Sequence, residues 1–241
     1  MDWQFSKDTF NYKSVETWLG VAKKRALFIG IASDAGVGKT ASLRMYAELN
    51  QSSSVFYLSC REWSRRDFLT HFCKCLNLAR PRTDDDAIQA IIDGLNKWAA
   101  SGTKPLVILD ETDKLKEFAL RVLIPIYNGC EKRVGLAICG TKTLESQFTS
   151  GVSKGRKGYD ELSSRFGRNF YTLPGCTINC IANICRANGI TDKVTQKRIF
   201  EECKPTSTNA FGGEKIVKVV YDLRKLERAV ERELELAEQK S

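Results

Sequence analysis

A short stretch near the amino terminus has the residue types that bind phosphate. It comprises Ser33, Asp34, Ala35, Gly36, Val37, Gly38, Lys39, Thr40 and Ala41. An apolar run precedes it and a helical pattern follows it, which is the context of a phosphate-binding loop. Glycine lets the backbone turn tightly so that N–H groups point inward, and the helix start adds partial positive charge. We expect Lys39 to reach the terminal phosphates of ATP and the Thr40 hydroxyl to bind Mg²⁺.

The first position of the motif departs from the usual pattern G-x-x-x-x-G-K-[ST], because Ser33 stands where glycine is expected. That glycine has mainly a conformational role, so serine suits the position if its φ angle is negative. The alternative interpretation is a chance glycine-rich turn. The order of strand, loop, Gly-Lys-Thr and helix favours the phosphate loop.

Two acids, Asp110 and Glu111, follow the apolar run at 106–109. Adjacent carboxylates at the end of a buried strand are costly unless a cation or a proton compensates them. Asp110 is therefore predicted to hold Mg²⁺ through water, and Glu111 to orient and deprotonate the attacking water. Asp113 is a weaker third acid. The alternative is a solvated turn, which the phosphate loop upstream makes the less favoured interpretation.

The elements that must position these residues alternate between strand and helix. Strands are expected at 26–32, 54–58, 106–109, 134–139 and 169–173, and helices at 14–24, 39–49, 65–76, 85–100 and 117–128. Apolar strands separated by helices predict an α/β fold with a parallel five-stranded sheet between helices.

After Pro174 the pattern becomes helical throughout, with helices expected at 177–188, 192–203 and 213–239. Apolar residues recur every three or four positions along the last segment. We therefore predict two domains, a nucleotide-binding α/β core at 1–174 and a small helical lid at 175–241.

The composition limits the function classes. The chain has 241 residues, 42% of them hydrophobic, and a formal charge of +9, which favours a polyanionic partner such as nucleic acid. Nine cysteines without CxxC pairs and a single histidine, His71, make a zinc site improbable. The start is unlike a signal peptide, and no apolar run approaches the roughly 20 residues that span a bilayer. The prediction is a soluble cytoplasmic protein with no membrane partner.

Three segments together resemble the AAA+ superfamily of ATPases: Gly36-x-Gly38-Lys39-Thr40, Leu109-Asp110-Glu111 and Ser163-Ser164-Arg165-Phe166. The resemblance implies a P-loop NTPase core with a helical lid, Mg²⁺-dependent ATP hydrolysis and assembly into rings or helices. It also implies that Arg165, with Arg168 as the alternative, completes the ATP site of a neighbouring subunit. Thr141 matches the sensor 1 position, and Lys215 or Lys218 occupies the place of the sensor 2 arginine.

Within that superfamily, the middle of the chain resembles the Mu B and TnsC group of transposition ATPases. The segment that points there is Gly158-Tyr159-Asp160-Glu161-Leu162-Ser163-Ser164-Arg165. The resemblance implies an ATPase that polymerises on duplex DNA without sequence specificity, selects the transposition target and activates a transposase.

Basic clusters offer the DNA contacts that such a function needs. The candidates are Arg61, Arg65, Arg66 and Lys142. The loop at 154–157 is a second cluster, which could instead contact a neighbouring subunit's nucleotide. Phosphate contacts of this kind give salt-dependent affinity without sequence preference. The alternative for each cluster is a solvated surface.

Three other functions remain in consideration. A replication initiator or helicase loader would normally carry a winged-helix tail, and a secretion ATPase of the ExeA type would need a membrane or wall-binding segment. A nucleotide-binding scaffold without hydrolysis conflicts with the presence of Lys39, Asp110 and Glu111.

Overall fold

A computed structural model describes residues 3–51, 54–209 and 216–239 of the chain. It divides into two compact units. The sheet unit comprises Thr17–Ser33 and Tyr46–Thr172, and the terminal unit comprises Met1–Glu16, Asp34–Met45 and Leu173–Ser241. The division into domains at 1–174 and 175–241 stays a prediction.

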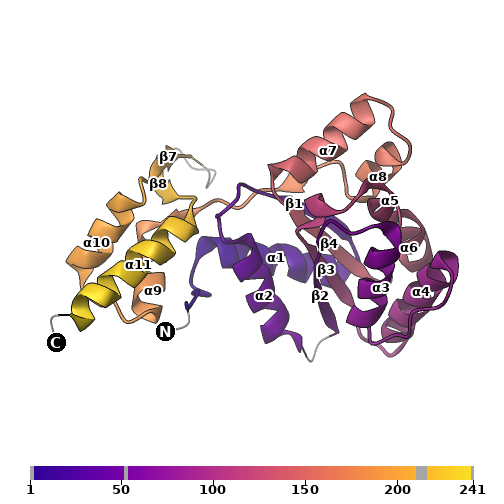
Figure 1. Cartoon of the computed structure of the whole chain (residues 1–241), viewed down its shortest axis with the longest axis horizontal. Helices are drawn as coiled ribbons and strands as arrows, with labels where there is room; N and C mark the ends of the chain where they lie inside the picture. The colour runs from indigo at the N-terminus through magenta and orange to yellow at the C-terminus, as the bar shows by residue number, and fades with distance from the viewer. Residues whose placement is uncertain (1–2, 52–53, 210–215, 240–241) are drawn as a thin grey trace. The chain divides into compact units, whose positions relative to one another are not determined.

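The sheet unit contains the parallel five-stranded sheet that the sequence predicts, in the order β2-β3-β4-β1-β5 (Figure 1). Its strands are β1 (Phe28–Ala32), β2 (Val55–Ser59), β3 (Leu106–Asp110), β4 (Gly135–Gly140) and β5 (Phe170–Tyr171). The three inner strands β3, β4 and β1 are buried along their whole length, which explains their continuous apolar sequence. Because all pairings are parallel, the carboxyl ends of the strands meet at one edge of the sheet.

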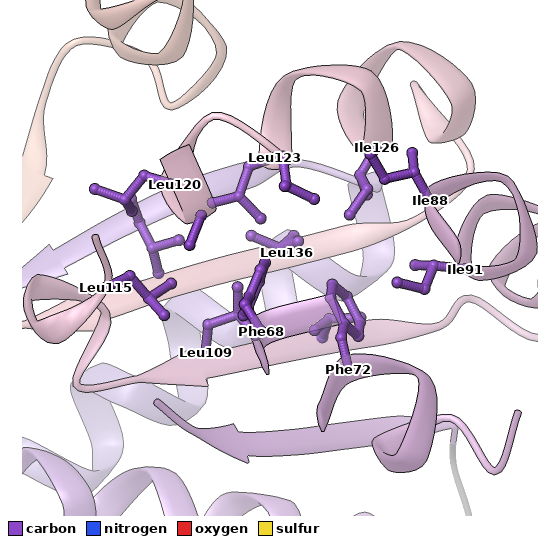
Figure 2. Packing of buried hydrophobic residues seen from close by; sticks show 14 of the residues in the cluster. Phe68, Phe72, Ile88, Ile91, Leu109, Leu115, Leu120, Leu123, Ile126 and Leu136 are labelled. Atoms are coloured by element: carbon purple, nitrogen blue, oxygen red, sulfur yellow. The ribbon is translucent and has the colours of Figure 1, made fainter. Parts of the chain in front are cut away.

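One helix precedes β1, and the others connect the strands. They are α1 (Phe10–Arg25), α2 (Lys39–Leu49), α3 (Arg65–Cys75), α4 (Asp84–Ala100), α5 (Glu117–Leu120), α6 (Leu123–Cys130), α7 (Lys142–Ser153) and α8 (Tyr159–Arg165), with the 3-10 turn η2 (Thr112–Lys114) after β3. Figure 2 shows the core on one face of the sheet, where Phe68 and Phe72 of α3 and Ile91 of α4 pack on Leu109 and Leu136.

The sequence of α4 explains why this helix packs as it does. Its buried residues recur on one face, at Ala87, Ile88, Ile91, Ile92 and Leu95. The Thr83 hydroxyl caps its first turn by accepting the Asp86 N–H at 3.1 Å. Acidic residues fill that turn, where the helix dipole favours negative charge.

Three details of this unit differ from the predictions. Helix α1 begins at Phe10 instead of residue 14, and the helix expected at 117–128 is broken at Arg121 into α5 and α6. Helices α7 and α8, in the segment 142–165, were not predicted. Serine, threonine and glycine, which are poor helix formers, are frequent in that segment, so packing and the Thr141 cap decide its structure.

The carboxyl-terminal part of the chain forms helices together with a second sheet. The helices are α9 (Ile178–Ala187), α10 (Lys193–Glu202) and α11 (Leu223–Glu238), and the strands are β6 (Cys176–Thr177), β7 (Thr206–Thr208) and β8 (Val217–Val220). The strands pair antiparallel in the order β6-β8-β7. Ile181, Ile184, Phe200, Leu226 and Val230 belong to the core that the helices share.

The prediction of a helix over 213–239 is therefore wrong in its first part. Ile216, Val219 and Leu223 have helical spacing, but Val217, Val219 and Val220 are β-branched residues that favour a strand. Pairing with β6 and β7 selects the strand, and the helix begins only after the Asp222 cap. Residues 213–215 lie outside the described part of the chain.

All nine cysteines are free thiols, eight of them buried and Cys75 half-buried. Among the described helices, none has the length and apolar character needed to cross a membrane.

Candidate nucleotide site

The phosphate loop (residues 33–40) begins directly after β1 and ends where α2 starts at Lys39. Gly36 and Gly38 have φ angles of 84° and 93°, in the left-handed region that favours glycine. A Cβ at Gly36 would lie 2.8 Å from Oδ1 of Asp222, and one at Gly38 would lie 2.7 Å from Cδ1 of Leu223. Both conformation and close approach therefore require glycine at these positions.

The first loop residue, Ser33, belongs to the sheet unit. It is buried, and its N–H donates to the Gly140 carbonyl oxygen at 3.3 Å. It is not among the described residues with positive φ, so the serine occupies its position without backbone strain. Ser33 and Asp110 leave β1 and β3 at the same edge of the sheet, with β4 between those strands.

Within the terminal unit, the start of α11 and a buried asparagine hold the phosphate loop. The Leu223 N–H donates to the Gly36 carbonyl oxygen at 2.8 Å. Asn11 is fully buried and donates from Nδ2 to the Val37 carbonyl oxygen at 2.7 Å, while its Oδ1 accepts the Gly175 N–H at 3.0 Å. Asn11 thus joins the phosphate loop to the first turn of the carboxyl-terminal segment. Sequence reasoning missed it, because a lone asparagine in a helix carries no motif.

We expect Asn11→Leu to lower the free energy of unfolding by roughly 2–5 kcal/mol. The substitution keeps the volume similar but leaves the Val37 carbonyl and the Gly175 N–H buried without their partner, and each orphaned group costs about 1–3 kcal/mol. Urea unfolding monitored by circular dichroism measures this. The exposed Asn179→Ala is the matched control, with an expected change within about 0.5 kcal/mol. A loss no larger than the control's would contradict the role given to Asn11.

Lys39 and Thr40 open α2, as the phosphate-loop pattern requires. The ammonium of Lys39 lies over its own loop and donates to the Asp34 carbonyl oxygen at 2.7 Å. Both side chains are only partly buried, so a ligand can reach them. The N–H groups at the start of α2 add positive potential next to the lysine.

Asp110 and Glu111 stand at the carboxyl end of β3. Asp110 is 1% exposed, and its carboxylate accepts the Tyr57 hydroxyl at 2.8 Å and the Glu111 N–H at 2.8 Å. Glu111 has a φ angle of 54°, a left-handed conformation that is rare for residues other than glycine. Strain of this kind is frequent at functional sites, and here it turns the second carboxylate out of the strand.

The Glu111 carboxylate has two polar partners of its own. Lys114 forms an ion pair with it at 2.6 Å, and the Ser59 hydroxyl of β2 donates to it at 3.3 Å. Nearby, burial raises the pKa of the Cys60 thiol well above its usual range, and the negative charges of Asp110 and Glu111 raise it further. Negative charge is therefore concentrated at this end of the sheet, where a cation would be stabilised.

Thr141 follows β4 and caps α7. Its hydroxyl donates to the Asp113 carboxylate at 2.7 Å and accepts the Thr143 N–H at 3.3 Å. The Asp113 carbonyl oxygen accepts the Gln147 amide at 3.2 Å, so α7 is attached to the acidic end of β3 at two points. Thr141, Asp113 and Glu111 thus lie just after neighbouring strands, and the sensor 1 role of Thr141 stays a prediction.

The donor atoms fit magnesium. Thr40 in the terminal unit has a hydroxyl and Asp110 in the sheet unit has a carboxylate, and oxygen atoms of both kinds are the hard ligands that Mg²⁺ prefers. Across residues 3–51, 54–209 and 216–239, no three His, Cys, Asp or Glu side chains group closely enough to hold a metal by themselves.

Arg165 is held inside its own chain. Its guanidinium pairs with Glu161 at 2.7 Å, donates to Asn128 at 2.7 Å and lies 5.0 Å from the Tyr127 ring centroid. Its side chain is 18% exposed, against 57% for Arg168, which pairs with Asp160. Arg165 would have to leave these partners to reach a neighbouring subunit, so its role in trans stays a proposal, and Arg168 is the more accessible of the two.

One of the four predicted DNA-contact residues has its charge compensated within the chain. Arg61, Arg66 and Lys142 are exposed. Arg65, by contrast, pairs with Asp84 at 3.5 Å and with Asp85 at 2.8 Å, which compensates its charge. The sequence could not reveal this pairing, since the partners lie about 20 positions downstream on α4.

The two predicted sensor 2 lysines do not open a helix in the described chain. Lys218 is an exposed residue of β8, and Lys215 lies outside the described residues. Asp222 and Leu223 touch the phosphate loop at the start of α11, so a helix start does lie beside the loop within the terminal unit. The signal that could have identified this helix start is Asp222, a typical helix cap directly before an apolar helical pattern.

Comparison with solved structures identifies similar folds. Cdc6p from Pyrobaculum aerophilum is 16% identical over 73% of this chain and 47% of that chain, with a TM-score of 0.52. The Aeropyrum pernix ORC2 protein in ADPNP–ADP complexes is 13% identical over 91% of this chain and 59% of that chain, with a TM-score of 0.55. The replication initiator DnaA bound to AMPPCP and single-stranded DNA is 17% identical over 95% and 63%, with a TM-score of 0.51. At these identities the likeness shows the fold alone, and this chain spans less than two thirds of each structure's length.

None of the curated proteins compared with this sequence matches it. A family model does: the one described as AAA domain matches residues 22–148, just over half of the chain. The match covers the phosphate loop, the acidic end of β3 and Thr141. The chain belongs to the AAA domain family.

Proposed function

We propose that this chain is an ATP-hydrolysing AAA+ switch that acts on DNA as an oligomer. The observation that carries the proposal is the pairing of two sequence features with one parallel sheet. A phosphate loop that requires glycine follows β1, and β3 ends at the buried Asp110, directly before the strained Glu111. Lys39 binds the terminal phosphates, and Thr40 and Asp110 hold the metal. Bound there, Mg²⁺ would supply positive charge against the phosphates of the nucleotide.

Glu111 acts as the group that orients and deprotonates the attacking water. Ser59 and Lys114 hold its carboxylate, and releasing them would free it for that task. Thr141 reports the state of the terminal phosphate to α7 through its bond to Asp113. An arginine of a neighbouring subunit, Arg165 or Arg168, completes the site.

Two DNA-linked activities are candidates for this chain. The similar solved structures include a replication initiator bound to single-stranded DNA and an ORC2 protein in nucleotide complexes, which favours an initiator or helicase-loader type of activity. The segment from Gly158 to Arg165 is the basis for a transposition regulator that polymerises on duplex DNA and activates a transposase. The fold similarity supports the initiator type better.

One experiment tests the proposal and separates the branches. The ATP hydrolysis rate and the particle shape in negative stain are measured with no DNA, with single-stranded DNA and with duplex DNA. We expect ATP-dependent assembly that DNA promotes. Long polymers on duplex DNA would support the transposition type, whereas assembly that prefers single-stranded DNA would support the initiator type. No ATP-dependent assembly in any arm would contradict both.

A further inference from the structure

A group of basic side chains surrounds an exposed phenylalanine in the sheet unit. We call it the basic–aromatic surface, and its members are Lys116, Phe118, Arg121, Lys154, Arg156 and Lys157. They come from α5 with its flanking residues and from the connection between α7 and α8 (Figure 1).

The two segments pack directly against each other. Gly158, with a φ angle of 85°, is so close to the α5–α6 turn that a Cβ would lie 3.3 Å from Nε of Arg121 and 3.3 Å from Cδ1 of Ile124. Tyr159 interacts with both segments, through Glu117 of α5 and Arg156 of the α7–α8 connection. Burial raises the pKa of the Tyr159 hydroxyl, the nearby Glu117 carboxylate raises that pKa further, and a hydrogen bond with Arg156 lowers it. Residues about 40 positions apart in the sequence therefore form one surface.

Phe118 is the most exposed aromatic side chain among the described residues, at 67%. A single exposed apolar side chain is ordinary on a protein surface. This ring, however, carries the Arg121 guanidinium 5.7 Å from its centroid. A phenyl ring with an adjacent guanidinium offers a flat face for stacking and a positive charge for phosphate.

The charge of the surface is positive after its acidic neighbours are counted. Asp160 and Glu161 pair with Arg168 and Arg165, outside the surface. Two other carboxylates lie close to the surface. Glu117 is near Tyr159, and Asp67 is near Lys116 and accepts hydrogen bonds from the Ser64 cap. Five basic side chains thus face two carboxylates, whereas in the Arg61–Arg66 cluster Arg65 is compensated by two aspartates.

We propose that the basic–aromatic surface binds single-stranded nucleic acid, with its lysines and arginines on the phosphates and Phe118 against a base. Basic grooves with aromatic stacking platforms are the common means of binding single strands. A duplex keeps its bases stacked and gives Phe118 no such partner. The inference rests on the proposed function and names the nucleic-acid surface that the function requires.

The position of this surface also connects it to the nucleotide site of the proposed function. Its residue Lys154 directly follows α7, the helix whose first half is attached to Asp113 through the Thr141 cap and Gln147. A movement of Thr141 in response to the terminal phosphate would be carried along one helix to Lys154. Binding of the strand and of ATP would then influence each other.

Charge reversal tests the electrostatic part. The variant Lys154→Glu/Lys157→Glu is compared with wild type by fluorescence anisotropy, using a labelled single-stranded oligonucleotide over a range of salt concentrations. We expect at least a tenfold loss of affinity at low salt and a salt slope flatter by about 1.4, because two phosphate contacts are removed. The matched control is Lys97→Glu/Lys132→Glu, which makes the same charge change at exposed positions in the last turn of α4 and just before β4.

Phe118→Ala tests the aromatic part. We expect it to weaken binding of the single strand by about tenfold and binding of the matching duplex by less than twofold. Equal effects on both would overturn the stacking role. Anionic phosphatidylserine vesicles form a further arm, and a wild-type protein that binds vesicles but no oligonucleotide would overturn the proposal in favour of a lipid surface.

Binding of a fluorescent ATP analogue, measured in every variant, keeps this inference separate from the proposed function. We expect it to be unchanged. If wild type binds both ATP and the oligonucleotide, and the Lys154/Lys157 variant binds both with the same affinities, only the assignment of the nucleic-acid surface is wrong. If wild type binds no ATP, the proposed function fails.

Discussion

Lys39→Ala is expected to weaken ATP binding by roughly 10- to 150-fold and to abolish ATP-dependent assembly. The ammonium is the one charged group of the phosphate loop placed at the start of α2, and charge-assisted hydrogen bonds to phosphate contribute about 1.5–3 kcal/mol. Isothermal titration calorimetry measures the affinity, and sedimentation with and without ATP measures the assembly.

Lys197→Ala, at an exposed position of α10, is the matched control and should bind ATP like wild type. The Lys39 variant should also unfold at the same urea concentration as wild type, because its side chain is only partly buried. If the variant assembles with unchanged ATP dependence, the nucleotide is bound elsewhere and the phosphate-loop assignment is wrong.

Glu111→Gln is expected to lower the rate of ATP hydrolysis by about 10²- to 10⁴-fold while leaving ATP binding intact. The amide keeps the size of the side chain and can still contact Ser59, but it cannot take a proton from water. Because hydrolysis would release the assembly, the variant should remain assembled longer in ATP than wild type. Steady-state phosphate release and the time course of light scattering measure the two effects.

Glu145→Gln makes the same chemical change on α7, at a partly buried glutamate in the first turn of that helix, and should retain hydrolysis near the wild-type rate. Hydrolysis by Glu111→Gln within a factor of ten of wild type would mean that another group activates the water. Asp113, bound to Thr141, would then be the next residue to test.

The sheet could be predicted because its signals are local. The inner strands are short apolar runs buried on both faces, and β3 and β4 end at an acid and a glycine. The order of strands along the chain does not specify their order in the sheet, so β2-β3-β4-β1-β5 became known only from the structure.

The carboxyl-terminal segment shows where such reasoning fails. Ile216, Val219 and Leu223 match a helical period as well as a strand followed by a helix. Antiparallel pairing of Val219 with Thr177 and Thr206 decides the outcome, and those partners are distant in sequence. The same limit hid Asn11, whose side chain bonds to Val37 and Gly175, 26 and 164 positions away.

The residue types and spacing alone determined the phosphate loop, the acidic strand end and the α/β class, because these depend on contiguous residues with narrow physical requirements. Only the tertiary structure decided which charged side chains are paired within the chain and which segments form a common surface. It pairs Arg65 with aspartates of α4, holds Arg165 against Glu161, and joins the α7–α8 connection to Arg121 beside Phe118. The reason is physical: a charge acts through its neighbours in space, and folding brings together groups that the sequence keeps apart.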